Sequence, residues 1–204
     1  MTTKTNLETQ WRELVRHLAS LLGMSDQRCF DDARFDVGTA AGPDDAVEPR
    51  SYPVLRHLGH ALALDASVST VCSVLVPFQS RLRWQQNPNY VGADFVSGYA
   101  YCELVGPAGS LRHPGIALGL LLLGPRVTYP EHAHPAAEVY AVVAGCAQWR
   151  QGDRLWRRRA PGERIHHASN EPHAMRTADE PLLAAYLWQD HLDQGARLLE
   201  GSAS

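Results

Sequence analysis

The stretch that most constrains the fold begins after Pro88, where the chain becomes a series of short apolar runs separated by turn residues. Val, Tyr, Leu and Trp are common in the runs, and Gly, Pro and Asp occupy the breaks. Runs at such hairpin-like intervals are typical of antiparallel all-β domains. The expected strands are Phe95–Val105, Ile116–Leu123, Arg126–Tyr129, Glu138–Val143, Ala147–Gln151, Arg154–Arg158, Arg164–His167, His173–Thr177 and Leu182–Trp188. The series predicts a mainly β protein, built as a small barrel or jelly roll.

The residues before this region predict helices. Apolar side chains recur at spacings of three and four over 5–22, which places them on one stripe of a helix. They are Leu7, Trp11, Leu14, Leu18 and Leu21. Thr5 and Glu8 fit a capping box at the start of this helix. Two further helices are expected at Val54–Leu64 and Ser67–Val76.

The domain organisation follows from the helical pattern before Pro88 and the strand pattern after it. With 204 residues, 45% of them apolar, the chain can bury the core of one domain. We expect a helical extension at 1–90 that packs on a barrel at 91–190, and a C-terminal tail at 191–204. The four cysteines form no CxxC pair, so neither a disulfide framework nor a zinc knuckle is indicated. The six arginines between Arg150 and Arg164 favour a solvated sheet edge over a phosphate site.

Charge and hydropathy limit the possible partners. Nineteen Lys and Arg against 22 Asp and Glu give a formal net charge of -3, which lacks the basic field of nucleic-acid or membrane binding. The longest apolar stretch, Ile116–Leu123, is far shorter than the roughly 20 residues that span a bilayer. No apolar signal core precedes Asn6. We expect a cytoplasmic protein that binds a small molecule, with a homodimer through the helices left open.

Four polar side chains between 132 and 140 have the spacing to meet inside a barrel. His132 and His134 lie two residues apart, so in a strand they project from the same face. Glu138 and Tyr140 share that parity and open the next expected strand, which would return antiparallel after a turn. His173 could bring a third imidazole from a neighbouring strand. Burying these groups is costly unless partners satisfy them, and one divalent cation would satisfy them all.

The same region resembles the cupins. HxH, three residues, Glu, six residues and Gly, within Gly124–Gly145, resemble the first cupin motif, and Gly152, Pro161-Gly162 and His173 resemble the second. The resemblance implies a double-stranded β-helix barrel with an N-terminal helical region. It implies one divalent ion (Zn, Fe, Mn, Ni or Co) held by His132, His134, Glu138 and His173. Two departures are seven residues instead of five between Gly124 and His132, and Thr177 in place of the usual Asn.

Within the cupins, a smaller set of residues resembles the DddQ-like dimethylsulfoniopropionate (DMSP) lyases. The set is Tyr129, His132, His134, Glu138, Tyr140, His173 and Trp188. This resemblance implies a carbon–sulfur lyase that splits DMSP into dimethyl sulfide and acrylate by β-elimination. Tyr140 is then the general base and a further metal ligand, and Tyr129 belongs to the catalytic set.

Elementary chemistry is compatible with these roles. A tyrosine with a pKa near 10 becomes a useful base at neutral pH only where a metal stabilises its phenolate. A methylated sulfonium ion suits aromatic faces, with a cation–π attraction of about 0.5–2 kcal/mol. Trp188, Tyr129 and Tyr101 are the candidate receptors, whereas His166 and His167 are expected to be structural. Two alternatives are another cupin enzyme, a dioxygenase or isomerase, and a non-catalytic cupin that binds a small molecule.

Overall fold

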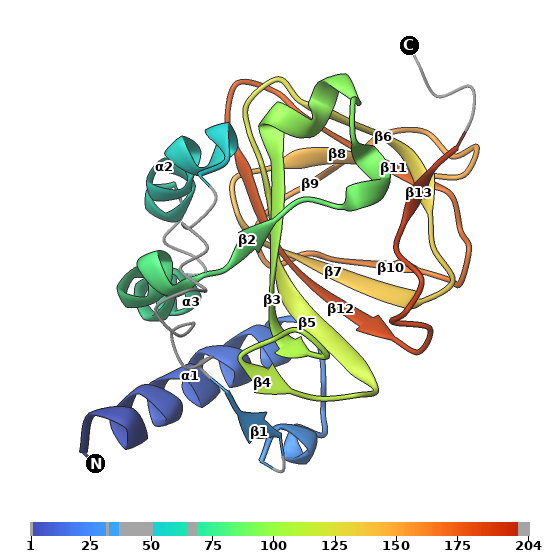
Figure 1. The fold of residues 1–204 in the computed structure, drawn as a ribbon. Coiled ribbons are helices and arrows are strands. Elements are labelled where there is room, and N and C mark those ends of the chain that lie inside the picture. Colours follow the sequence, from blue (N-terminus) through green and yellow to red (C-terminus); the bar gives the residue numbers. More distant parts are fainter. Residues whose placement is uncertain (1, 32, 37–50, 65–68, 200–204) are drawn as a thin grey trace.

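The computed structural model describes residues 2–31, 33–36, 51–64 and 69–199, which form two β-sheets and three α-helices (Figure 1). The larger sheet has the strand order β1-β4-β3-β5-β12-β7-β10, with β2 paired to β3, and the smaller has the order β13-β6-β11-β8-β9. The helices are α1 (Thr2–Leu21), α2 (Leu58–Ala63) and α3 (Ser69–Leu75). The strands are β1 (Arg34–Phe35), β2 (Trp84–Gln85), β3 (Tyr99–Gly106), β4 (Leu111–Arg112), β5 (Ile116–Leu123), β6 (Thr128–Ala133), β7 (Ala137–Ala144), β8 (Ala147–Gln151), β9 (Arg157–Arg159), β10 (Arg164–His167), β11 (His173–Thr177), β12 (Leu182–Gln189) and β13 (Arg197–Leu198).

The larger sheet separates two hydrophobic cores. Strand β5 is buried at every residue because both of its faces are covered. Leu118, Leu120 and Leu122 face the core that contains Leu14 and Leu18 of α1. The alternate residues of β5 face the barrel interior and pack with its aromatic side chains. Figure 1 shows the helices outside the barrel, along the larger sheet, and no residue of α1, α2 or α3 lines the cavity inside the barrel.

Most expected elements are present, with informative differences at their ends. Strands β5, β8, β10 and β11 have the predicted bounds. Residues Asp94–Gly98 form the 3-10 helix η5 instead of the start of a strand, so β3 begins at Tyr99. The capping box is wrong, because α1 begins at Thr2 and the Glu8 carboxylate accepts from Arg12 one turn later. Pro77 ends α3 but not the helical path, which continues as the 3-10 helix η3 (Val76–Arg81).

Strands β9 and β13 form the two edges of the smaller sheet. Strand β9, with three consecutive arginines, is an edge strand of the smaller sheet, as the charge pattern indicated. At the other edge, β13 pairs with β6. The carbonyl of Ala196, just before β13, accepts from the Asn87 and Asn89 side chains at 2.9 and 3.0 Å.

Within the described part of the chain, no helix has the length and apolarity to cross a membrane.

Candidate metal centre

Strands of both sheets bring the expected ligands together. His132 lies on β6 with His134 just beyond its end, and His173 begins β11. His173 pairs in register with His132, which brings the smaller sheet's imidazoles close to one another. Glu138 lies on β7 of the larger sheet. The smaller sheet therefore supplies the histidines and the larger sheet the carboxylate.

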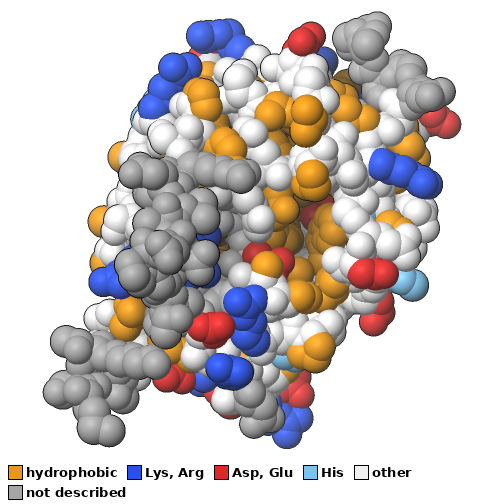
Figure 2. Space-filling model, viewed as in Figure 1, with side chains coloured by type: hydrophobic (Ala, Val, Ile, Leu, Met, Phe, Trp, Pro, Cys, Tyr) orange, Lys and Arg blue, Asp and Glu red, His pale blue; other side chains and the backbone are white. Residues whose placement is uncertain are grey.

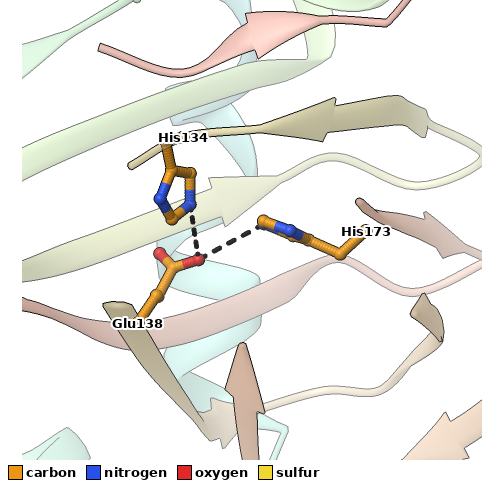
Figure 3. Close-up of side chains that lie close together, drawn as sticks. All are labelled: His134, Glu138 and His173. Atoms are coloured by element: carbon orange, nitrogen blue, oxygen red, sulfur yellow. Dashed lines mark hydrogen bonds and ion pairs between the residues drawn. The ribbon is translucent and has the colours of Figure 1, made fainter. Parts of the chain in front are cut away.

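The tightest group consists of His134, Glu138 and His173, all buried (Figure 3). Glu138 Oε2 lies 3.1 Å from His134 Nε2 and 3.3 Å from His173 Nε2. One possible ligand atom from each residue lies within 4.8 Å of the other two. Figure 3 shows both imidazoles turned toward the same carboxylate oxygen. Two imidazoles and a carboxylate suit several divalent transition metals, and this donor set does not select one of them.

A shared hydrogen-bond pattern orients three histidines. In each ring, Nδ1 lies at hydrogen-bond distance from a backbone carbonyl two residues away. The distances are 2.8 Å (His132 to Pro130), 2.9 Å (His134 to Ala136) and 2.8 Å (His173 to Glu171). A carbonyl only accepts, so each neutral ring carries its proton on Nδ1 and keeps an Nε2 lone pair. This is the arrangement of metal-bound histidines, whose second nitrogen commonly donates to a carbonyl.

The charges of the group follow from burial and proximity. Burial opposes protonation of His134, but the Glu138 carboxylate raises the His134 pKa above its usual value. Burial also disfavours the Glu138 carboxylate, yet His134 and His173 hold its pKa well below the usual range. Burial and His173 together hold the pKa of His132 well below normal. Glu138 is therefore ionised and His132 neutral at pH 7, the states that metal ligation requires.

Trp188 and His167 flank Glu138 as its two cross-strand neighbours. Trp188 Nε1 donates to Glu138 Oε1 at 2.5 Å, and its indole stacks on His134 with 4.1 Å between ring centroids. His167 is buried and stacks on His173 at 3.9 Å, whereas its neighbour His166 is exposed. Adjacent residues of a strand point to opposite faces, so the sequence allowed one of these two histidines to face the site but did not select His167. Ile165 and His167 are two residues apart on β10, so both side chains face the barrel interior. Which face of β10 is the inner one is known only from the strand register.

Tyr129 and His132 form a stacked pair beside the three-residue group. Their ring centroids are 4.0 Å apart and their planes differ by 3°. Phe95 stacks on Tyr129 at 5.1 Å, and the Tyr129 hydroxyl lies 2.7 Å from that of Tyr90. The His132 ring meets His173 edge-on at 4.1 Å. His132 thus borders the group, and its Nε2 atom is the candidate for a fourth metal ligand.

A cavity of about 450 Å³ opens inside the barrel next to Glu138. Its lining contains the four aromatic residues singled out in the sequence: Tyr101, Tyr129, Tyr140 and Trp188. Tyr140 is buried, and burial together with the Glu138 carboxylate raises its pKa well above the usual value. Its hydroxyl is therefore a neutral phenol at pH 7 unless a positive charge lies nearby.

Part of the cavity wall consists of residues that the sequence pattern did not indicate. Tyr99, Tyr186 and Glu103 also line it. The alternation Tyr99, Tyr101, Glu103 along β3 could have indicated a shared inward face. Of the cavity's described lining residues, three carry carboxylates (Glu103, Glu138 and Asp193) and none is Lys, Arg or His. Figure 2 shows a hollow on this face whose wall is mainly hydrophobic, with acidic side chains within it.

Known proteins share this sequence and arrangement. A sequence model of the dimethylsulfoniopropionate lyases matches residues 26–184. The chain belongs to the dimethylsulfoniopropionate lyase family. It is 37% identical over 143 residues to the dimethylsulfoniopropionate lyase DddQ of Ruegeria pomeroyi, a match that covers 70% of this chain and 68% of that protein. It is 35% identical over 144 residues to the putative dimethylsulfoniopropionate lyase DddL of Cereibacter sphaeroides, covering 69% of this chain and 60% of DddL.

Solved structures of DMSP lyases share the fold. The crystal structure of Ruegeria pomeroyi DddQ superposes with a TM-score of 0.74 at 24% identity, over 96% of this chain and 99% of that one. A chain from the structures of the DMSP lyases RdDddP and RnDddQII superposes with a TM-score of 0.69 at 25% identity, over 93% and 100%. The superposition confirms the expected cupin barrel with its helical extension. The family match confirms the enzyme class, a carbon–sulfur lyase.

Two positions show how this DMSP lyase family member accommodates the cupin motifs. Thr177, which replaces the usual Asn, donates from Oγ1 to the Gly124 carbonyl at 2.6 Å and accepts from Val127 N at 3.0 Å. It therefore anchors the longer turn before β6. Gly145 has a φ of +72°, and a Cβ there would lie 2.0 Å from the Pro181 carbonyl oxygen. Only glycine fits this close turn.

Proposed function

We propose that the protein cleaves dimethylsulfoniopropionate to dimethyl sulfide and acrylate in the cavity beside Glu138. The observation that carries this proposal is the cavity lining, in which aromatic rings and carboxylates occur without a basic side chain among the described residues. Such a wall favours a small molecule with a cationic, methylated end. The substrates named for DddQ and DddL have such an end.

The candidate ligands fit one divalent ion. His134, Glu138 and His173 would hold it, together with His132, whose ring contacts His173. Tyr140 is the proposed further ligand, since its hydroxyl interacts with the Glu138 carboxylate. When bound, the ion would attract the substrate carboxylate and offset the negative charge of Glu138, which lowers the cost of forming a phenolate at Tyr140. Trp188 would hold Glu138 in place through its indole N–H. Because indole is uncharged, this hydrogen bond leaves the negative charge of Glu138 in place, so that the bound metal ion can neutralise it.

Tyr140 is the proposed general base. Its phenolate oxygen takes a proton from the carbon next to the substrate carboxylate, and the electron pair of the broken carbon–hydrogen bond forms the carbon–carbon double bond. The bond between the β-carbon and sulfur breaks with both electrons going to sulfur. The sulfonium thereby leaves as neutral dimethyl sulfide, and acrylate keeps the single negative charge. Tyr140 ends the step as a neutral phenol, the state that its burial favours.

The aromatic residues of the cavity have two proposed roles, contact with the substrate and positioning of a metal ligand. Trp188 and Tyr101 line the cavity and are only partly buried. The Tyr101 ring and the face of Trp188 that does not stack on His134 are the proposed contacts of the sulfonium group. Tyr129 also lines the cavity, but its contacts with His132, Phe95 and Tyr90 favour a role in positioning His132.

The first experiment measures dimethyl sulfide in the headspace above chelator-treated protein reloaded with Mn, Fe, Zn, Ni or Co under anaerobic conditions. We expect release with at least one ion and little without. Tyr140→Phe should keep the bound metal but lose about 10²–10⁴-fold in activity. Tyr101→Phe is the matched control, since it removes the same atom elsewhere in the cavity, and should lose much less. Oxygen consumption without dimethyl sulfide, or full activity of Tyr140→Phe, would contradict the proposal.

A further inference from the structure

We propose that Glu103 determines specificity for the charge of the substrate, by supplying the negative countercharge for its cationic end. This inference rests on the proposed function, since it assigns the far end of the same cavity. Glu103 lines that cavity together with Tyr101 and Tyr186. The expected ligand class is a short carboxylate whose other end carries a sulfonium or quaternary ammonium group.

The strand register places Glu103 at the opposite end of a row that begins at Tyr140. Tyr140 on β7 pairs with Tyr186 on β12, Tyr186 pairs with Gly119 on β5, and Gly119 pairs with Glu103 on β3. These four residues therefore cross the inner face of the larger sheet in one line. Gly119 has no side chain, so the Tyr186 ring lies over β5 and its hydroxyl comes within 3.5 Å of the Cys102 carbonyl.

The inward direction of Glu103 follows from alternation along β3. Tyr99 and Tyr101 belong to the aromatic core inside the barrel, whereas Ala100, Cys102 and Leu104 belong to the core beneath the helices. Glu103 has the parity of the two tyrosines. A carboxylate thus follows two aromatic rings on the same face, at the end of the cavity away from the histidines.

The carboxylate acts on the rings around it. Burial raises the pKa of Tyr101 to about 12 and that of Tyr186 well above its usual value, and in both residues Glu103 adds to the shift. The field that disfavours a phenolate there favours a bound cation. Arg112 contributes a positive charge near Glu103, but it is not part of the cavity lining. A cation placed between these rings would meet both aromatic faces and a partly buried negative charge.

The simplest competing role for Glu103 is to close the following turn. Glu103 Oε1 accepts from Ala108 N at 2.6 Å, and a Cβ at Gly106 would lie 2.3 Å from the same oxygen. A glutamine keeps an amide oxygen for this hydrogen bond, removes the charge and places an NH2 group where the other carboxylate oxygen was. Glu103→Gln therefore separates a role in recognition from a role in the turn.

Two probes of similar shape test the charge alone. We would measure by calorimetry the binding of 3-(trimethylammonio)propionate, which is cationic at one end, and 4,4-dimethylpentanoate, which has a neutral group of the same shape there, to the metal-loaded protein. The wild-type protein should prefer the cationic probe. Glu103→Gln should reduce that preference by about tenfold while leaving the affinity for 4,4-dimethylpentanoate nearly unchanged. For DMSP, the same variant should raise KM more than it lowers kcat.

The controls keep this inference separate from the proposed reaction. Glu180→Gln makes the same chemical change on an exposed turn and should leave the preference unchanged. An equal loss of affinity for both probes in Glu103→Gln would assign the residue to the turn, and an unchanged preference would exclude the countercharge; either result overturns the inference. If no dimethyl sulfide forms, the proposed reaction fails, yet the probe preference still decides the role of Glu103.

Discussion

Trp188 shows how one residue can serve a different purpose from the one its type suggests. Its aromatic face favoured contact with a cation, and it does line the cavity. Its indole N–H also donates to Glu138, and its ring stacks on His134. The first of these contacts depends on the β7–β12 register, which pairs Trp188 with Glu138 across 50 positions of sequence. No local spacing in the sequence contains that information.

His167 makes the stability of the metal-free protein sensitive to pH. Burial and the neighbouring His173 lower its pKa from 6.5 to about 3. The unfolded chain therefore takes up a proton near pH 6.5, whereas the folded protein does so only near pH 3. As pH falls through this window, the free energy of unfolding should drop by about 1.4 kcal/mol per pH unit from this residue. Above pH 6.5 His167 is neutral in both states and contributes no slope.

Urea unfolding of chelator-treated protein at pH 7, 6 and 5 measures this effect. His167→Gln should give a shallower decline than the wild-type protein, by about 1.4 kcal/mol per pH unit below pH 6.5. The low pKa of His132 affects both proteins equally and cancels in the comparison. Parallel curves would show that His167 is protonated in the folded state.

The expectations for single residues succeeded where parity was sufficient. His134 and Glu138 were expected to converge, and they do, because two-residue alternation and a short hairpin are local properties. His173 joins them through the pairing of β11 with β6, for which only the resemblance to the cupins gave an expectation. Glu103 was not selected, because the expected strand Phe95–Val105 begins in a 3-10 helix and its inward face was unknown. The roles of Tyr140 and Tyr129 stay predictions, since geometry alone does not report chemistry.

At the level of strands, length decided what could be predicted. Strand β5 has eight consecutive buried residues, and its bounds were predicted correctly. Strands β1, β2, β4 and β13 have two residues each and were missed, because two residues have no readable periodicity. These short strands form only because the longer strands offer them an edge, which is a tertiary effect.

Gly119 allows strand β5 to pass beneath Tyr186. A Cβ at this position would lie 2.0 Å from the Cys102 carbonyl oxygen and 2.6 Å from the Tyr186 hydroxyl. Gly119→Ala should therefore lower the free energy of unfolding by about 1–3 kcal/mol and displace Tyr186 into the cavity. Urea unfolding and the KM for DMSP would measure the two effects.

Gly59→Ala is the matched control for this substitution. Gly59 lies in α2, and a Cβ there would meet nothing within 4 Å. The alanine should raise stability by about 0.5–1 kcal/mol, because it restricts the unfolded chain and favours the helix. Equal effects of the two substitutions would show that the space over Gly119 is not needed.

For the molecule as a whole, the candidate metal centre joins the two sheets of the barrel. The histidines belong to β6 and β11 or their ends, in the smaller sheet, and Glu138 belongs to β7 in the larger. The helices cover the opposite face of the larger sheet, so they stabilise the barrel without lining its cavity. A cation bound by all of these residues would link β7 of the larger sheet to β6 and β11 of the smaller sheet, with which β7 is not paired.

This arrangement predicts that metal loading stabilises the whole fold. A ligand at 100 times its Kd adds about 2.7 kcal/mol to the free energy of unfolding, which for a chain of this size raises Tm by roughly 5–10 °C. We expect calorimetry to show such a rise for the wild-type protein and for Tyr140→Phe. Glu138→Gln keeps the shape of the side chain but loses the charge that joins the sheets, and its Tm should barely respond to metal. If Glu138→Gln gained as much as the wild-type protein, the ion would be bound elsewhere.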